Sequence, residues 1–150
     1  MNASDTKHIL VVAHRTAATP RLMEAVRSRA AQGPCAFTLL VPELRETHAP
    51  EEADMVLALA LPLFEEAAGG EVEGRKGPSD PYRAVEELHR RTPFDEIILS
   101  TLPEHASHWL RRDLPSKLER LGVPVNVVTA KAGDPRRTRT GRFAPTVTAR

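Results

Sequence analysis

Polar and basic side chains that suit a small ligand stand directly after short apolar runs of the sequence. Such runs are typical of buried parallel strands, and open parallel sheets bind ligands beyond the carboxyl ends of their strands. The candidate ligand-binding residues at these positions are Ala13, His14, Arg15, Thr16, Val41, Ser100 and Thr101. Arg15 offers a cation to an anionic group, and the hydroxyls of Thr16 and Ser100 offer hydrogen bonds. The alternative is a solvated loop after Ala13 and a turn at Ser100 that satisfies its own backbone.

Two adjacent arginines, Arg111 and Arg112, are the remaining candidates for ligand binding. Guanidinium groups bind phosphate and carboxylate through a fork of paired hydrogen bonds. Neighbouring side chains on a helix point about 100° apart, so at most one of the two arginines is expected to face a ligand. The alternative is a charged surface pair with Trp109 packed beneath it.

No complete catalytic or metal-binding constellation occurs in the sequence. The G-x-S-x-G elbow, the Walker loop, the C-x-x-C pair and the G-x-G-x-x-G fingerprint are all absent. His105 and His108 have a spacing that suits a metal, but no third ligand motif accompanies them. Cys35 lies between Pro34 and an apolar run without an activating base, so we expect it to pack. We predict no catalytic residue and no metal.

Five segments have the features of strands. They are His8–Ala13, Ala36–Val41, Glu71–Gly74, Glu96–Ser100 and Val123–Val128. Four of them are apolar without alternation, which indicates burial on both faces of a parallel sheet. The charged Glu71–Gly74 is weaker and suits an exposed edge.

Helical patterns fill the intervals between these strands. We expect helices to begin after Thr19 as N-cap, at Pro50, after Asp80, and at about Ser107. In the first, Leu22, Met23, Val26 and Ala30 share one face. In the third, Tyr82, Val85 and Leu88 point inward.

Two of these helices carry further expectations. The second is expected to be buried, to run through Met55, Leu59 and Leu63, and to kink at Pro62. The last extends to Leu121, is divided by Pro115, and has Asp113 as a cap for its second half. The alternation of strands and helices predicts an α/β three-layer sandwich.

The charge is divided unevenly between a domain and a tail. Six of the 21 basic residues but only one of the 20 acidic residues fall in Lys131–Arg150, so residues 1–130 carry about −4. We predict one α/β domain over residues 1–130 and a basic, disordered tail over residues 131–150. The domain itself offers no general basic face for nucleic acid.

The sequence also indicates a cytoplasmic protein. Met1–His8 is polar and lacks the apolar core of a secretory signal. The longest apolar stretch, Met55–Phe64, is too short to cross a bilayer. The single cysteine, Cys35, can form no internal disulfide, which suits a reducing compartment.

Three segments are similar to strands of the universal stress protein family. Lys7–Val12, Phe94–Thr101 and Val123–Val128 resemble its first, fourth and fifth strands, and the resemblance covers Lys7–Thr129. It implies a five-stranded, mainly parallel sheet in the order 3-2-1-4-5, as in the adenine-nucleotide alpha-hydrolase-like folds. It also implies a homodimer formed through the last strand, Val123–Val128.

The chain departs from the residues by which such proteins bind ATP. ATP-binding members carry an aspartate after the first strand and a G-x-x-G-x(9)-G-[S/T] signature after the fourth, whose glycines let backbone amides close on phosphate. Here Ala13–Thr16 stands in place of the aspartate, and Ser100, Pro103 and Asp113 stand in place of the glycines. No glycine occurs between Gly77 and Gly122. ATP or another adenine nucleotide is therefore a cofactor only if the phosphate loop has been rebuilt.

Three functional hypotheses follow. The first is a non-enzymatic, universal-stress-like protein that acts in stress physiology through a partner or a small-molecule ligand. The second is a nucleotide sensor or nucleotide-dependent enzyme whose rebuilt loop uses His14, Arg15, Ser100 and one of Arg111 and Arg112. The third, and weakest, is a nucleic-acid accessory protein that uses the basic tail.

Overall fold

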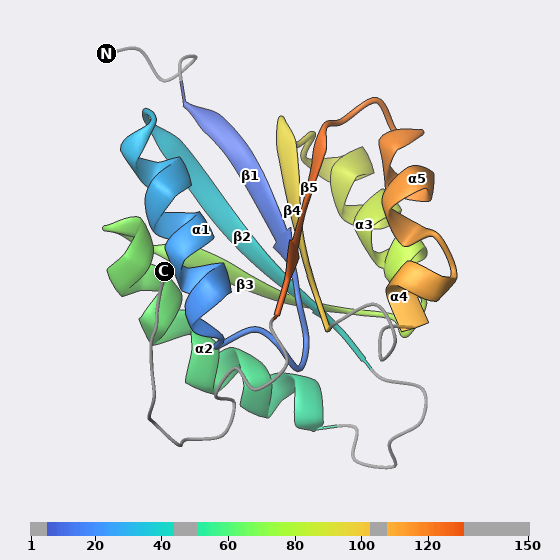
Figure 1. The fold of residues 1–150 in the computed structure, drawn as a ribbon, viewed down its shortest axis with the longest axis horizontal. Helices are drawn as coiled ribbons and strands as arrows, with labels where there is room; N and C mark the ends of the chain where they lie inside the picture. The colour runs from blue at the N-terminus through green and yellow to red at the C-terminus, as the bar shows by residue number, and fades with distance from the viewer. Residues whose placement is uncertain (1–5, 44–50, 103–107, 131–150) are drawn as a thin grey trace.

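The structure is a computed structural model that describes residues 6–43, 51–102 and 108–130. The predicted tail, residues 131–150, lies outside the described residues. Strands and helices alternate along the chain (Figure 1). The elements are β1 (Lys7–Val12), α1 (Pro20–Ala31), β2 (Cys35–Pro42), α2 (Glu52–Ala68), β3 (Val72–Gly77), α3 (Pro81–Arg91), β4 (Glu96–Thr101), α4 (His108–Arg111), α5 (Leu114–Glu119) and β5 (Val125–Thr129).

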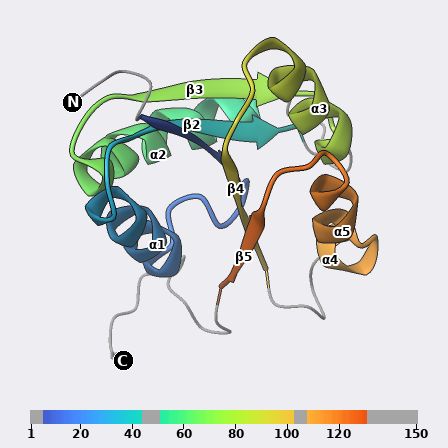
Figure 2. The ribbon, with the colours of Figure 1, turned by 90° about the horizontal axis from the view of Figure 1, so that it is seen from above.

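The strands form one sheet in the order β3-β2-β1-β4-β5, and every pair of neighbours is parallel. Helices α1 and α2 cover one face, while α3, α4 and α5 cover the other (Figures 1 and 2). The predicted three-layer α/β sandwich and its strand order are thereby confirmed.

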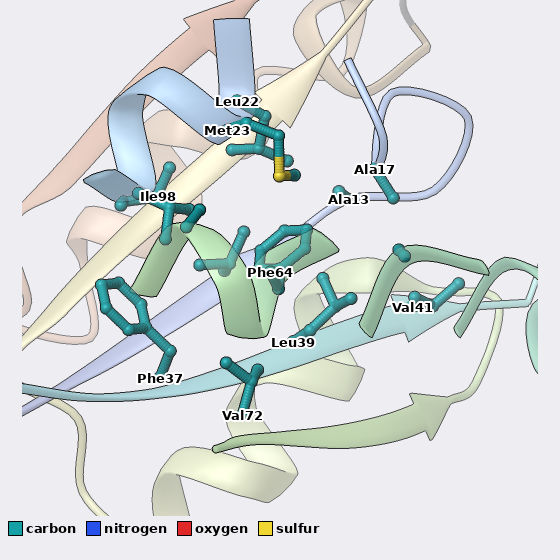
Figure 3. Packing of buried hydrophobic residues seen from close by; sticks show 14 of the residues in the cluster. Ala13, Ala17, Leu22, Met23, Phe37, Leu39, Val41, Phe64, Val72 and Ile98 are labelled. Atoms are coloured by element: carbon teal, nitrogen blue, oxygen red, sulfur yellow. The ribbon is translucent and has the colours of Figure 1, made fainter. Parts of the chain in front are cut away.

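Two hydrophobic clusters fill the spaces between the layers. Along β1, Ile9 and Val11 belong to the cluster under α1 and α2, whereas Leu10 and Val12 belong to the cluster under α3 and α5. Figure 3 shows the first cluster, in which Phe64 of α2 lies among side chains of β2 and α1. Because alternate residues face two cores, the strands are continuously apolar, as a doubly covered parallel sheet requires.

Helix α2 turns a different face to the core from the one that we expected. Its buried side chains are Ala53, Ala60, Phe64 and Ala67. Met55, Leu59 and Leu63 are exposed to 59%, 71% and 41%, so the expectation that they are buried is wrong. Leu57 and Leu61 pack over Gly74, where a Cβ would lie 2.8 Å from Leu61 Cδ1. Small residues in the helix and in β3 thus allow a close approach, and the larger side chains remain outside.

The helix expected over Ser107–Leu121 is broken earlier than Pro115. It is divided into α4 and α5 at Asp113, which has a left-handed backbone with φ 60° and ψ 40°. Asp113 occupies the expected N-cap position of α5, but its side chain makes no cap hydrogen bond, so that part of the expectation is wrong. Pro115 lies in the first turn of α5, where a missing N–H costs no helical hydrogen bond.

Strand β3 extends three residues beyond the predicted end at Gly74 because its backbone pairs with β2 as far as Gly77. Its charged side chains, among them the ion pair of Arg75 with Glu73, are exposed, as expected for an edge strand. A Cβ on Gly77 would lie 2.7 Å from the Cβ of Ala84 in α3. This glycine therefore sets how closely α3 approaches the sheet.

We predict that Gly77→Ala lowers the free energy of unfolding by about 1 to 3 kcal/mol, because the added methyl must displace α3. Urea unfolding of the full chain measures the change. Gly70→Ala is the matched control, because its Cβ would meet nothing within 4 Å, and we expect a change within about 0.5 kcal/mol. Equal effects of the two substitutions would contradict the close approach.

Candidate functional site at the carboxyl edge of the sheet

The carboxyl ends of β1 and β4 are the topological switch point of the sheet. These two strands are neighbours, and the chain leaves β1 toward α1 on one face and β4 toward α4 on the other (Figure 1). In open α/β sheets, ligands bind at the edge where successive connections diverge in this way. The sequence-predicted residues after β1 and at the end of β4 lie at this edge.

A pair of hydroxyl groups joins the two strand ends. Thr16 Oγ1 and Ser100 Oγ are 2.5 Å apart and 84 residues apart in sequence. The side chains are nearly inaccessible, since Thr16 is 3% exposed and Ser100 is 2% exposed. Either oxygen is a possible donor, so the pair retains one further hydrogen and free lone pairs beyond its mutual bond.

The loop from Ala13 to Thr19 is held by bonds within itself. The Ala17 N–H donates to the His14 carbonyl at 3.2 Å, and the Thr19 N–H donates to the Thr16 carbonyl at 3.2 Å. The Thr19 hydroxyl donates to the same carbonyl at 3.0 Å. Thr19 therefore occupies the expected N-cap position without capping α1 through its side chain, and that part of the expectation is wrong.

The other residues proposed near β1 and β2 differ in exposure. Ala13 and Val41 lie in the hydrophobic cluster under α1 and α2 (Figure 3), and His14 is buried. Arg15 is exposed and supplies a cation beside the hydroxyl pair in sequence. Thus the apolar residues pack beneath the edge, while Arg15 is open to solvent.

Thr101 connects the site to the last strand. Its carbonyl accepts a hydrogen bond from the Ala130 N–H at 2.9 Å, and its hydroxyl is 3.5 Å from that of Thr129. Thr129 and Thr19 are polar residues of this edge that sequence reasoning did not select. Thr129 is recognised from the structure, because the register of β4 and β5 places it opposite Thr101.

Of the two arginine candidates, one has a side chain that the structure describes. Arg112 is exposed in the turn between α4 and α5. The side chain of Arg111 and residue His105 lie outside what the structure describes. Among the described residues, no group of three or more His, Cys, Asp or Glu side chains is arranged to hold a metal ion. Within the same residues, no helix is both long and apolar enough to cross a membrane.

A bidentate ion pair lies at the opposite, amino edge of the sheet. Arg29 Nε and Nη2 donate to the two carboxylate oxygens of Glu96, each at 2.9 Å. These hydrogen bonds raise the pKa of the Arg29 guanidinium, although its burial acts in the other direction. Burial also raises the pKa of the nearby Cys35 thiol, so the protonated thiol is favoured and Cys35 is a packed residue. The Arg29–Glu96 pair therefore fastens α1 to β4 at the amino edge of the sheet.

Comparisons with solved structures place this architecture among known folds. A universal stress protein in complex with cAMP matches with a TM-score of 0.60 at 17% identity, over 84% of this chain and 98% of that one. A universal stress protein from Archaeoglobus fulgidus matches with a TM-score of 0.60 at 16% identity, over 81% of this chain and 93% of the other. A family protein from Arabidopsis thaliana with AMP bound matches with a TM-score of 0.53 at 14% identity, over 84% and 93%.

These likenesses identify the fold. The chain has the five-stranded, all-parallel fold of universal stress proteins, as the resemblance of its first, fourth and fifth strands implied. Neither a protein-family model nor a curated protein matches the sequence.

We predict that Thr16→Val and Ser100→Ala each lower the free energy of unfolding by about 1 to 3 kcal/mol, because each leaves a buried hydroxyl without its partner. The double variant removes both hydroxyls, so its cost should fall below the sum of the single costs by about 0.5 kcal/mol or more. Urea unfolding of the four proteins measures this coupling. Strictly additive costs would show that the two hydroxyls do not stabilise each other.

Proposed function

We propose that this chain is a non-enzymatic, cytoplasmic protein of the universal stress type, which acts in stress physiology by binding a small ligand. The ligand that we propose is an adenosine monophosphate, AMP or cAMP, rather than ATP. Support comes from the fold and from two structures of similar fold, one in complex with cAMP and one with AMP bound. The binding region is the edge formed by the ends of β1 and β4.

The observation that carries this proposal is the Thr16–Ser100 hydroxyl pair at the switch point, with the exposed Arg15 one residue away. Neutral hydroxyls and one guanidinium can bind a single phosphate group by hydrogen bonds and one charge contact. A triphosphate carries more negative charge and is usually held by several backbone amides in a glycine-rich loop. The positions of those glycines hold Ser100, Pro103 and Asp113 in this chain.

Asp113 supports the choice of a monophosphate in a second way. It has a left-handed backbone, the conformation that glycine adopts without cost, but carries a carboxylate that is exposed. Its N–H donates to the Leu110 carbonyl at 3.0 Å and so is engaged within the turn. A carboxylate in this turn repels a triphosphate, which carries more negative charge, more than it repels a monophosphate.

We predict that AMP or cAMP binds the full chain more tightly than ATP does in isothermal titration calorimetry, and that ATP is not hydrolysed. Arg15→Ala should weaken monophosphate binding about tenfold, which corresponds to roughly 1.4 kcal/mol. Arg27→Ala is the matched control, because Arg27 is an exposed arginine further along α1. Absence of binding by AMP and cAMP, or tighter binding of ATP, would overturn the proposal.

We further propose that the protein is a homodimer formed through β5. This strand ends the described sheet, pairs with β4 on one side, and exposes Asn126 and Val127. Pro124, whose missing N–H would interrupt pairing, precedes β5 at Val125 rather than lying within it. A second copy of β5 would extend the sheet by backbone hydrogen bonds.

We predict a dimer of the full chain by size exclusion with light scattering, and a monomer for Val127→Lys, because a lysine blocks edge pairing. Glu73→Lys on β3, the other edge of the sheet, is the control and should leave the dimer intact. A monomeric wild-type chain contradicts the proposal, as does dissociation caused by the β3 variant alone.

A further inference from the structure

Helix α2 exposes a stripe of three large apolar side chains, Met55, Leu59 and Leu63. Residues four apart lie on one face of a helix, so the three form a continuous row along α2. Their exposed fractions are 59%, 71% and 41%; among the described residues the one other exposed large hydrophobic side chain, Val127 in β5, is less open at 36%. Contiguous apolar surface of this kind marks a contact site in soluble proteins. We call this row the apolar stripe of α2.

Acidic residues lie at both ends of the stripe. Glu52 and Asp54 are in the first turn of α2, Glu65 and Glu66 are near its end, and the helix contains no basic residue. One cation from β3 reaches this helix, since Lys76 Nζ is 3.1 Å from an oxygen of Asp54. Two copies of α2 packed on each other would bring acidic ends together in either direction, which disfavours a symmetric contact. The surface suits an occupant that is apolar in the middle and basic around it.

Lys131–Arg150 of this chain has that composition. It contains six basic residues and one acidic residue, and its larger apolar side chains, Phe143 and Val147, lie between Arg142 and Arg150. Phe143 and Val147 are four positions apart in the sequence, and basic residues flank them. The apolar and charged groups of this segment therefore complement those of the stripe of α2.

The chain is long enough to make this contact. The described residues end at Ala130, whose N–H donates to the Thr101 carbonyl at the carboxyl edge of the sheet. Helix α2 starts from the same edge, because β2 runs toward it (Figure 1). From β5 to β2 is three strand spacings, about 15 Å, whereas the 12 residues between Ala130 and Phe143 span up to about 40 Å when extended.

From these observations we propose that the basic segment Lys131–Arg150 docks on the apolar stripe of α2 of the same chain. Phe143 and Val147 cover Leu59 and its neighbours, and the arginines meet the carboxylates at the two ends of the helix. The contact does not depend on nucleotide binding, so it stands or falls separately from the function proposed above.

A spin label tests the proximity directly. We introduce Ala144→Cys together with Cys35→Ser in the full chain, attach a nitroxide, and record the broadening of backbone amide signals. Signals of residues 52–68 should be lost, while those of α3 and α5 on the opposite face remain. Broadening that is absent from α2, or spread evenly over the molecule, would overturn the proposal.

The same spin label tests whether the contact depends on the carboxylates of α2, and whether the docked segment belongs to the same chain. Glu65→Lys with Glu66→Lys should restore the α2 signals, as should salt of about 1 M, at which the Debye length is about 3 Å. Glu119→Lys, an exposed acidic residue of α5, is the control and should leave the broadening unchanged. A mixture of isotope-labelled chains and separate spin-labelled chains should show no broadening; if α2 signals are lost there, the segment comes from a second copy and docking within one chain is wrong.

Stability supplies an independent measurement. Leu59→Ser should lower the urea midpoint of the full chain, since it removes an apolar contact with the segment. In a chain that ends at Ala130, the same substitution should leave the midpoint unchanged or raise it, because Leu59 is then uncovered. Equal effects in the two backgrounds would contradict the docking, and the spin-label experiment remains decisive if the shortened chain does not fold.

Discussion

The burial of β1 on both faces is the constraint from which the remaining structure follows. Ile9, Leu10, Val11 and Val12 are fully buried, and alternate members of this run belong to two different cores. A strand in this position needs a parallel neighbour on each side and helices above and below. The chain leaving β1 therefore starts inside the protein, where each polar group needs a hydrogen-bond partner.

This requirement explains the arrangement of the candidate site. Thr16 and Thr19 are polar but buried; the Thr16 hydroxyl pairs with that of Ser100, and the Thr19 hydroxyl donates to the Thr16 carbonyl. The hydroxyls of Thr16 and Ser100 thus stabilise the junction of β1, α1 and β4. Under the proposed function, a ligand at this edge would exchange one hydrogen bond for another rather than simply add one. Recognition of that kind favours ligands with acceptors in defined places over ligands that bring only charge.

Much of the fold was predictable because it depends on runs of apolar residues, whereas the details of the site depend on contacts between distant residues. The strands that form the centre of the sheet were identified from continuous apolarity, and β3 was recognised as an edge strand from its charges. The buried face of α2 was not predicted, because apolar residues occur on several sides of this helix. Its close approach to the sheet depends on small residues, namely the buried alanines of α2 and Gly74 of β3. Thr16 and Ser100 were both selected, but their contact depends on the path of a loop that no local pattern specifies.

The backbone at Asp113 separates the shape of a loop from its chemistry. A left-handed residue other than glycine costs about 1 to 2 kcal/mol, although aspartate is among the residues that tolerate it best. The conformation suited to glycine is therefore present without glycine, and one substitution at this position would change the charge of the loop while leaving its course intact. The shape of this turn and its charge can therefore be altered independently, because the backbone at position 113 already has the form that glycine adopts without cost.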